Sequence, residues 1–405
     1  MFEFDLRDQI PHDNSYGTQE PNWGGAACCQ MVMNGYPSGA TSCYIDQTTI
    51  WNYIQANNKE GGTGPWGIGW YADPYAVTKT LNDLCPPQHH WVDVSGINKE
   101  QVLYTLLRWM AKYKYASLVC VHVHDLWRVL VYYKTSDDPQ QVTNPEVNLI
   151  GFYIPYYSEW LGGPVVDYSE IDGNAWMEGP YNWGLPCNGF YGTPNTCGQI
   201  WNGKWVGVGE PPEKEGKVKI EIFSRVGKEV IEPKKASEIA RKFVASRIRD
   251  KTKFISRYFF GIQDSKPMLV RELPIKNVKE NVDKTVHYYI VPFINKYEVN
   301  RKGDPITRLS VLINAYTGQF EELRIFSRPV RYLSEEEALN IAKRNLRLNQ
   351  SELQELNTEL VFSPIHPYIK NVLPAWKFKV KEKTIFITQN GLIVGGFYFP
   401  TYRGG

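Results

Sequence analysis

The chain has 405 residues, 42% of them hydrophobic and 22% charged, with a formal net charge of +2. This length fits two or three packed domains. So small a net charge gives no reason to expect nucleic acid or an anionic membrane as partner, and no stretch reaches the roughly 18 apolar residues of a membrane helix. The start, MFEFDLRDQIPHDN, lacks the pattern of a secretory signal, so the expected location is the cytoplasm.

Four early segments have the apolar spacing and boundary residues of helices. The first, GGAACCQMVMNGYP, starts at Gly25 and is stopped by Gly35 and Pro37. The second, DQTTIWNYIQANN, has Asp46 or Thr48 as its expected cap. The third and fourth read DPYAVTKTLNDLCPP and NKEQVLYTLLRWMAKY. All four lie ahead of the first strand-like segments.

Strand-like segments follow these helices, reading ASLVCVHV, LWRVLVYY and VNLIGFYI. Helices first and an antiparallel sheet afterwards predict an α+β fold. Residues 160–205 are rich in Gly, Pro, Asn and Trp and predict a long irregular loop. That loop either has a function or covers the sheet.

A change in composition marks a domain boundary near 211–217. Twelve of the thirteen Trp and all seven Cys precede it, and Lys, Arg and Glu with aliphatic residues follow it. Pro and Gly punctuate the chain there. We therefore expect a first domain at 1–212. Reduced thiols are expected in a cytoplasmic chain, although Cys187 and Cys197 are close enough to suggest a bridge or a metal clip.

The second part contains a weak internal repeat. PKKASEIARKFVASRIRD at 233–250 is similar to LSEEEALNIAKRNLRLNQ at 333–350, and each amphipathic helix is followed by strands. The hairpin turns NAYTGQF and ITQNGLI match, with Gly318 and Gly391 supplying a positive φ. The two expected units, 217–328 and 329–405, resemble the PepSY type of module. That resemblance implies a small helix-plus-antiparallel-sheet unit that inhibits, chaperones or binds.

The chemistry of the first domain depends on its opening helix. A cysteine peptidase needs a Cys at a helix N-terminus, a His at a strand start, an Asn or Asp on the next strand to orient the His, and a Gln as oxyanion donor. Gln19, Trp23 and a small-residue turn stand ahead of this helix. DLWRVLVYY and NLIGFYIP supply the flanks of the other two positions.

These flanks resemble the papain-like peptidases of the bacteriocin-leader, or double-glycine, type. That resemblance implies a papain-like fold over about 160 residues. It also places Gly24 at the nucleophile, Leu126 at the His and Ile154 at the Asp. None of these three residues can act as nucleophile, base or orienting group. Gln19 would remain as an oxyanion donor, but no oxyanion would form for it to stabilise. The resemblance therefore indicates a pseudopeptidase.

Displaced residues offer an alternative in which the chain is an active hydrolase. Cys28 lies one turn deeper on the helical face of Gly24, and His122 and His124 share the alternation of Leu126. The competing interpretation makes Cys28 a buried core thiol and both His residues structural or exposed. The pair in QHHW at 88–91 points in two directions and does not predict a metal site.

We therefore expect a non-catalytic protein that binds a peptide or protein partner, or assembles with itself through the C-terminal LIVGGFYFP. No cofactor is expected. The expected groove is lined by Trp23, Gly24, Gly25, Leu126 and Trp127, with Trp66 and Trp70 as further candidates. Either the space beside Gly24 is open, or the 160–205 loop plugs it with Trp160, Trp176 and Trp183.

Overall fold

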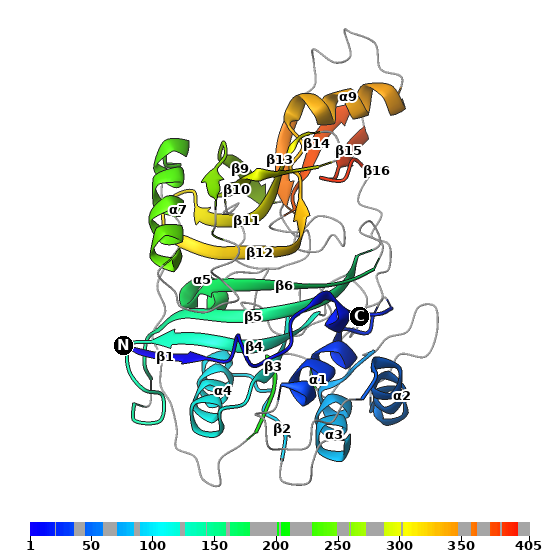
Figure 1. Ribbon diagram of the computed structural model, residues 1–405, viewed down its shortest axis with the longest axis vertical. Helices are drawn as coiled ribbons and strands as arrows, with labels where there is room; N and C mark the ends of the chain where they lie inside the picture. Colours follow the sequence, from blue (N-terminus) through cyan, green and yellow to red (C-terminus); the bar gives the residue numbers. More distant parts are fainter. Residues whose placement is uncertain are drawn as a thin grey trace. The chain divides into compact units, whose positions relative to one another are not determined.

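Figure 1 presents the chain as a computed structural model. The structure describes residues 1–20, 22–35, 45–59, 71–84, 90–121, 126–142, 144–158, 163–178, 201, 204–210, 229–248, 259, 261–272, 287–300, 303–346, 358–362, 373–380 and 383–395. The chain divides into two compact units, with the described residues up to 210 in the first and those from 229 on in the second. The boundary predicted near 211–217 falls in the stretch between them, which is outside the described residues.

The predicted helices of the first unit are all present. They are α1 (Gly24–Asn34), α2 (Gln47–Asn57), α3 (Pro74–Leu84) and α4 (Lys99–Tyr113). Asp46 caps α2 by accepting from the Thr49 N–H at 2.9 Å, and Asn98 caps α4 by accepting from the Gln101 N–H at 2.8 Å. Gly35 ends α1. The boundary residues thus act as capping physics predicts.

An antiparallel sheet forms the middle of the first unit. Its strands are β1 (Phe2–Asp5), β2 (Val92–Asp93), β3 (Ser117–Val121), β4 (Leu126–Thr135), β5 (Val147–Ser158), β6 (Gly163–Asp172) and β7 (Val206–Gly209). Their order is β6-β5-β4-β3-β7-β2. The second half of β4 pairs with β1, which follows the same edge as β3. Helices and an antiparallel sheet make the fold α+β, as expected.

Helices cover both faces of this sheet. Trp127 of β4 contacts the start of α1, and Tyr153, on the same face, stacks on His12 of the N-terminal segment at 5.1 Å. Gly207 of β7 lies on the opposite face, because it is in register with Val119 and Arg128, which alternates with Trp127 along β4. A Cβ added to Gly207 would meet Leu106 of α4, so α4 covers this face. The same face also carries the short α5 (Gly173–Glu178), whose Trp176 stacks on Phe152 at 4.3 Å.

The prediction of an irregular loop over 160–205 was wrong for its first part. Residues 163–172 form β6, which pairs with β5 along its whole length, and 173–178 form α5. The sequence hid this strand because Gly and Pro stand at its start and polar residues along it. Asp167, Ser169 and Glu170 are nevertheless buried. Residues 179–200 lie outside the described part of the chain.

The second unit contains two similar halves. The first has α7 (Pro233–Ile248) with β8 (Ile262–Asp264), β9 (Met268–Glu272), β10 (His287–Val299), β11 (Pro305–Asn314) and β12 (Phe320–Val330). The second has α9 (Glu335–Leu346) with β13 (Thr358–Phe362), β14 (Ala375–Val380), β15 (Lys383–Ile387) and β16 (Ile393–Gly395). Strands β9 to β12 are successive antiparallel neighbours, as are β13 to β16, and β9 pairs in parallel with β13.

Equivalent residues make equivalent contacts in the two halves. The two turn glycines have φ of +73° at Gly318 and +82° at Gly391. An added Cβ would lie 3.1 Å from Ile239 of α7 in one half and 3.3 Å from Ile341 of α9 in the other. These isoleucines occupy matching positions of the two helices. The internal repeat that the sequence suggested is therefore also present in the packing contacts.

An aromatic side chain holds the segment before each helix. The Tyr289 hydroxyl of β10 donates to the Ile231 carbonyl at 2.8 Å. The Trp376 indole of β14 donates to the Leu333 carbonyl at 2.9 Å. Both carbonyls precede their helix by the same number of residues. The repeat therefore extends to a specific hydrogen bond.

The two helices lie on opposite faces of the sheet of the second unit. Tyr289 points toward α7, and the strand pairing puts Arg271 of β9 on the same face. Arg271 is opposite Val361 on the parallel strand β13. Trp376, which contacts the segment before α9, is on the other face from Val361 by alternation along β13 and β14. One half is therefore turned over relative to the other.

Candidate functional site

The start of α1, where the nucleophile was expected, is shaped by the turn before it. The Trp23 N–H donates to the Glu20 carbonyl at 3.3 Å, and Asn22 has a φ of +79°. Asn tolerates this left-handed conformation better than most residues. Trp23 is the N-cap residue but gives α1 no side-chain cap. The first N–H groups of α1 thus have no capping side chain from that position.

The space behind this helix start is filled. Gly24 and Gly25 are buried. A Cβ added to Gly25 would lie 2.5 Å from the Ala72 Cβ and 3.4 Å from the Trp127 ring. The buried Trp127 indole also donates to the Ala72 carbonyl at 2.9 Å. The predicted contact between the first helix and the strand of Trp127 is therefore present. Of the predicted groove residues Trp23, Gly24, Gly25 and Trp127, only Trp23 is partly exposed.

Cys28 has the environment of a core thiol. It is completely buried in α1, as are Cys29 beside it and Cys120 on β3. Burial, together with the neighbouring Cys29, raises the pKa of the Cys28 thiol well above its usual value. A nucleophilic cysteine needs the opposite shift and an accessible sulfur. The structure thus gives Cys28 none of the activation that the hydrolase alternative requires.

One of the three expected catalytic positions faces away from the start of α1. Ile154 is buried on β5 and follows Tyr153, which shares a face with α1, so alternation directs Ile154 to the opposite face. Leu126 opens β4. His122 and His124 lie outside the described residues. The assignment of Ile154 to the orienting position beside Gly24 is therefore corrected: it faces away from α1.

A pair of buried glutamines holds the segment that carries Gln19. The Gln47 amide donates to the Gly17 carbonyl at 2.9 Å and to the Gln30 side-chain oxygen at 3.0 Å, and its own oxygen accepts from the Gln19 N–H at 3.2 Å. The Gln19 side chain itself is exposed. The polar group at this site that is fixed by packing is thus Gln47, which the sequence had not singled out.

A row of three aromatic rings lies next to the start of α1. Trp23 stacks on Trp51 of α2 with ring centroids 5.5 Å apart, and Trp51 stacks on Tyr71 at 6.3 Å. The interplanar angles are 19° and 29°, and all three side chains are partly exposed. We call Trp23, Trp51 and Tyr71 the aromatic row. Only Trp23 of the three was a predicted binding residue.

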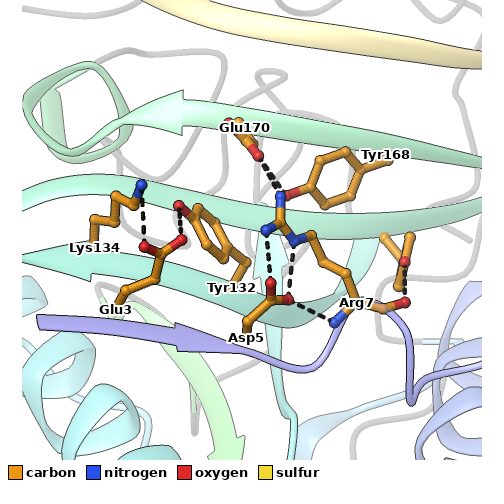
Figure 2. Close-up of polar contacts among 8 residues, drawn as sticks. Glu3, Asp5, Arg7, Tyr132, Lys134, Tyr168 and Glu170 are labelled. Carbon is orange, nitrogen blue, oxygen red and sulfur yellow. Dashed lines mark hydrogen bonds and ion pairs between the residues drawn. The ribbon is translucent and has the colours of Figure 1, made fainter. Parts of the chain in front are cut away.

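A buried ion network fixes the N-terminal segment on the sheet (Figure 2). The Arg7 guanidinium contacts Asp5 at 2.6 Å and the fully buried Glu170 at 2.9 Å. It lies over the Tyr132 ring, 4.1 Å from the centroid. The Tyr168 hydroxyl donates to Glu170 at 2.9 Å. This network anchors the chain that leads to Gln19 and Trp23, and its members come from strands too distant in sequence for a motif to reveal.

Other predicted candidates fall outside the described residues. They are Trp66, Trp70, Trp160, Trp183, Cys187, Cys197 and His89. His90, the second member of the His pair, is described and exposed. Among the residues that the structure describes, no three His, Cys, Asp or Glu side chains gather as metal ligands would. The described helices include none long and apolar enough to cross a membrane.

Comparisons with known proteins add little to this geometry. No protein-family profile matches the chain, and no curated protein matches its sequence. Among solved structures, a Bacillus megaterium YpeB C-terminal domain is similar at 10% identity, covering 66% of this chain and 89% of that one, with a TM-score of 0.18. A similarity of that size carries no inference about fold or function.

Proposed function

We propose that this protein is a non-catalytic, cytoplasmic binding or scaffold protein. Its first unit is a papain-like domain whose peptidase chemistry has been lost. Its second unit is a pair of PepSY-like modules, an assignment that the repeated helix and meander of the two halves support. The partner is a peptide or a protein, with self-assembly as the other non-catalytic role.

One observation carries this proposal. The helix that should present the nucleophile begins with Gly24, and the cysteine one turn deeper, Cys28, is completely buried with a raised pKa. The volume beside Gly25 is taken up by Ala72 and Trp127. A site without an accessible thiolate cannot form the acyl-enzyme of a cysteine hydrolase. The helix and the strand of Trp127 that flank the expected site are present, which supports a role in recognition or assembly.

The test combines turnover with thiol reactivity. The whole chain is incubated with a panel of extended peptides and peptide thioesters, in parallel with the Cys28→Ala variant, and products are followed by mass spectrometry. We expect no turnover from either protein. We also expect no iodoacetamide label on Cys28 at neutral pH until a denaturant is added. Turnover that Cys28→Ala abolishes would instead establish the active hydrolase that uses Cys28.

A further inference from the structure

We propose that His287 and Tyr316 form a proton-sensitive latch beside the start of α7, so that mild acidification loosens α7 from its sheet while α9 stays packed. His287 is the first residue of β10, and Tyr316 lies in the turn between β11 and β12. Nδ1 of the half-buried His287 ring hydrogen-bonds with the Tyr316 hydroxyl, and the two ring centroids are 5.5 Å apart. The inference concerns the second unit and does not depend on the proposed function.

This contact borders the hydrogen bonds that fix the segment before α7. The N–H of Ala315, the residue next to Tyr316, donates to the His287 carbonyl at 3.0 Å. The Ala315 carbonyl accepts from the Ile231 N–H at 2.7 Å, and the Ile231 carbonyl accepts from the Tyr289 hydroxyl at 2.8 Å. Ala315 therefore bridges the start of β10 to the residue two positions ahead of the helix. A shift of the His287 or Tyr316 side chain acts directly on this bridge.

The other half builds the same bridge without a titratable group. The repeat places Pro374 where the first half has His287, two residues before the aromatic side chain that holds each segment. There the Gln389 side-chain amide donates to the Pro374 carbonyl at 2.7 Å and accepts from the Leu333 N–H at 2.7 Å. Among side chains with unperturbed pKa values, only histidine changes its charge between pH 5 and 8. The segment before α9 thus serves as an internal control.

The charges around His287 oppose its protonation. Arg271 of β9 is its partner in the antiparallel register. Glu359 of β13 is the acidic group that acts on the ring, but its two oxygens already accept from Arg271 and from Lys377, each at 3.1 Å. Burial of the ring, and then the positive charge of Arg271, lower the pKa of His287, and the opposing effect of Glu359 does not cancel them. A proton on His287 therefore adds a like charge opposite Arg271, which destabilises a strand pair.

The hydrogen bond of the latch also changes when the ring gains a proton. In the neutral ring Nδ1 accepts from the Tyr316 O–H, whereas both nitrogens of a protonated ring are donors. The Tyr316 O–H must then turn away so that its oxygen can accept. Because the pKa of His287 is lower in the folded than in the unfolded chain, the stabilisation is complete above the ordinary value of about 6.5 and is lost as pH falls below it.

The experiment follows hydrogen exchange of the whole chain by mass spectrometry at pH 7.5 and pH 5.5, with each rate corrected for the intrinsic effect of pH. We expect the protection of peptides from α7 to fall about three- to ten-fold at the lower pH, because one proton changes an equilibrium by at most about ten-fold per pH unit. Protection of peptides from α9 should fall less than about two-fold. Both pH values lie above the ordinary pKa of Asp and Glu side chains, so exposed carboxylates stay ionised.

Three variants assign the response to the latch. His287→Gln keeps a side chain that can accept from Tyr316 but does not titrate, and we expect α7 to keep its protection at pH 5.5. His90→Gln makes the same change at an exposed His of the first unit, and this matched control should respond to pH as the wild type does. Arg271→Gln removes the positive charge and leaves Glu359 beside the ring, so the response of α7 should shrink or reverse.

An α7 response that His287→Gln leaves unchanged overturns the proposal, as does an equal loss of protection in α7 and α9. If His287→Gln does not fold, a nuclear magnetic resonance titration of the wild type labelled at histidine carbons decides instead. We expect the His287 ring to have a lower pKa in the folded chain than in the urea-unfolded chain. An equal or higher pKa in the folded chain rules out the latch.

Discussion

Cys28 illustrates how burial alone removes chemistry from a residue of the right type. Its thiol lies inside α1, beside Cys29 and away from solvent, so the charged thiolate is disfavoured. A nucleophilic thiol instead needs a helix N-terminus that is open to water, where the dipole and the solvent favour the thiolate. Neither Cys28 nor the buried first turn of α1 offers such a position.

The raised pKa of Cys28 predicts a loss of stability at alkaline pH. The unfolded thiol ionises above about pH 8.5 while the folded thiol stays protonated, so the stabilisation is complete below that pH and falls as pH rises. The slope for one such group is at most about 1.4 kcal/mol per pH unit. Urea unfolding of the wild type and of Cys28→Ala between pH 8 and 10 should show a shallower slope in the variant. Met31→Leu, in the same helix but without a titrating group, is the control and should keep the wild-type slope.

A substitution at Gly25 tests how tightly the space at the start of α1 is filled. An alanine there places its Cβ 2.5 Å from the Ala72 Cβ. Because that contact is too short for two carbons, the helix must shift, and overpacking of this kind costs about 1–3 kcal/mol. At Gly303, by contrast, an added Cβ would meet nothing within 4 Å but φ is positive, so Gly303→Ala reports backbone strain without overpacking. A Gly25→Ala variant with an unchanged melting temperature would contradict tight packing at this helix start.

We expect a large loss of stability when Arg7, which lies far from the expected catalytic positions in the sequence, is substituted. Replacing it with Met removes an ion-pair partner of the fully buried Glu170 and of the partly exposed Asp5. Breaking one side of a buried ion pair costs about 3–5 kcal/mol because the remaining charge stays buried. Arg331→Met, which removes ion pairs to Asp304 and Glu337 at a partly exposed position, is the comparison and should cost far less. Similar melting temperatures for the two variants would contradict a structural role for the buried network.

At the scale of elements, the sequence predicted helices far better than strands. Helices are indicated by local residues that act within one turn, such as the caps Asp46 and Asn98 and the terminating Gly35. Strand β6 was predicted as irregular loop, although Asp167 and Glu170 along it are buried. Their burial depends on partners that are distant in sequence, which no local pattern encodes.

The candidate site was predicted in part for the same reason. The burial of Cys28 and the contact of the first helix with Trp127 follow from helical spacing and from a short motif. The face of Ile154 does not, because it depends on the register between β4 and β5. That register shifts between Leu130 and Tyr132, and a shift of one residue exchanges the two faces of a strand. The aromatic row was missed because its three rings come from three separate segments.

The internal repeat predicts matched effects of two mutations. Tyr289→Phe and Trp376→Phe each remove one hydrogen bond to the segment before a helix, worth about 0.5–1.5 kcal/mol, and Trp376→Phe costs more because it also shrinks a packed ring. The sites lie in different halves, and the double variant should therefore cost about the sum of the two. Urea unfolding of the single and double variants measures this. A cost at one site alone would show that the halves share a sequence pattern but not its energetic role.

At the scale of the whole molecule, each unit has buried hydrophobic residues of its own. In the first unit α1 and α4 cover the two faces of one sheet. In the second, α9 packs on a cluster that includes Phe378 and Ile387, and Val361, Ala375 and Phe386 form a cluster on the other face. Units with separate cores are able to fold separately.

This separation predicts that fragments 1–210 and 229–405 fold when produced alone. Each should show one cooperative urea transition, and their far-ultraviolet circular dichroism spectra should add to that of the whole chain, because neither fragment interrupts a described helix or strand. A fragment that stays unfolded when produced alone would contradict independent units.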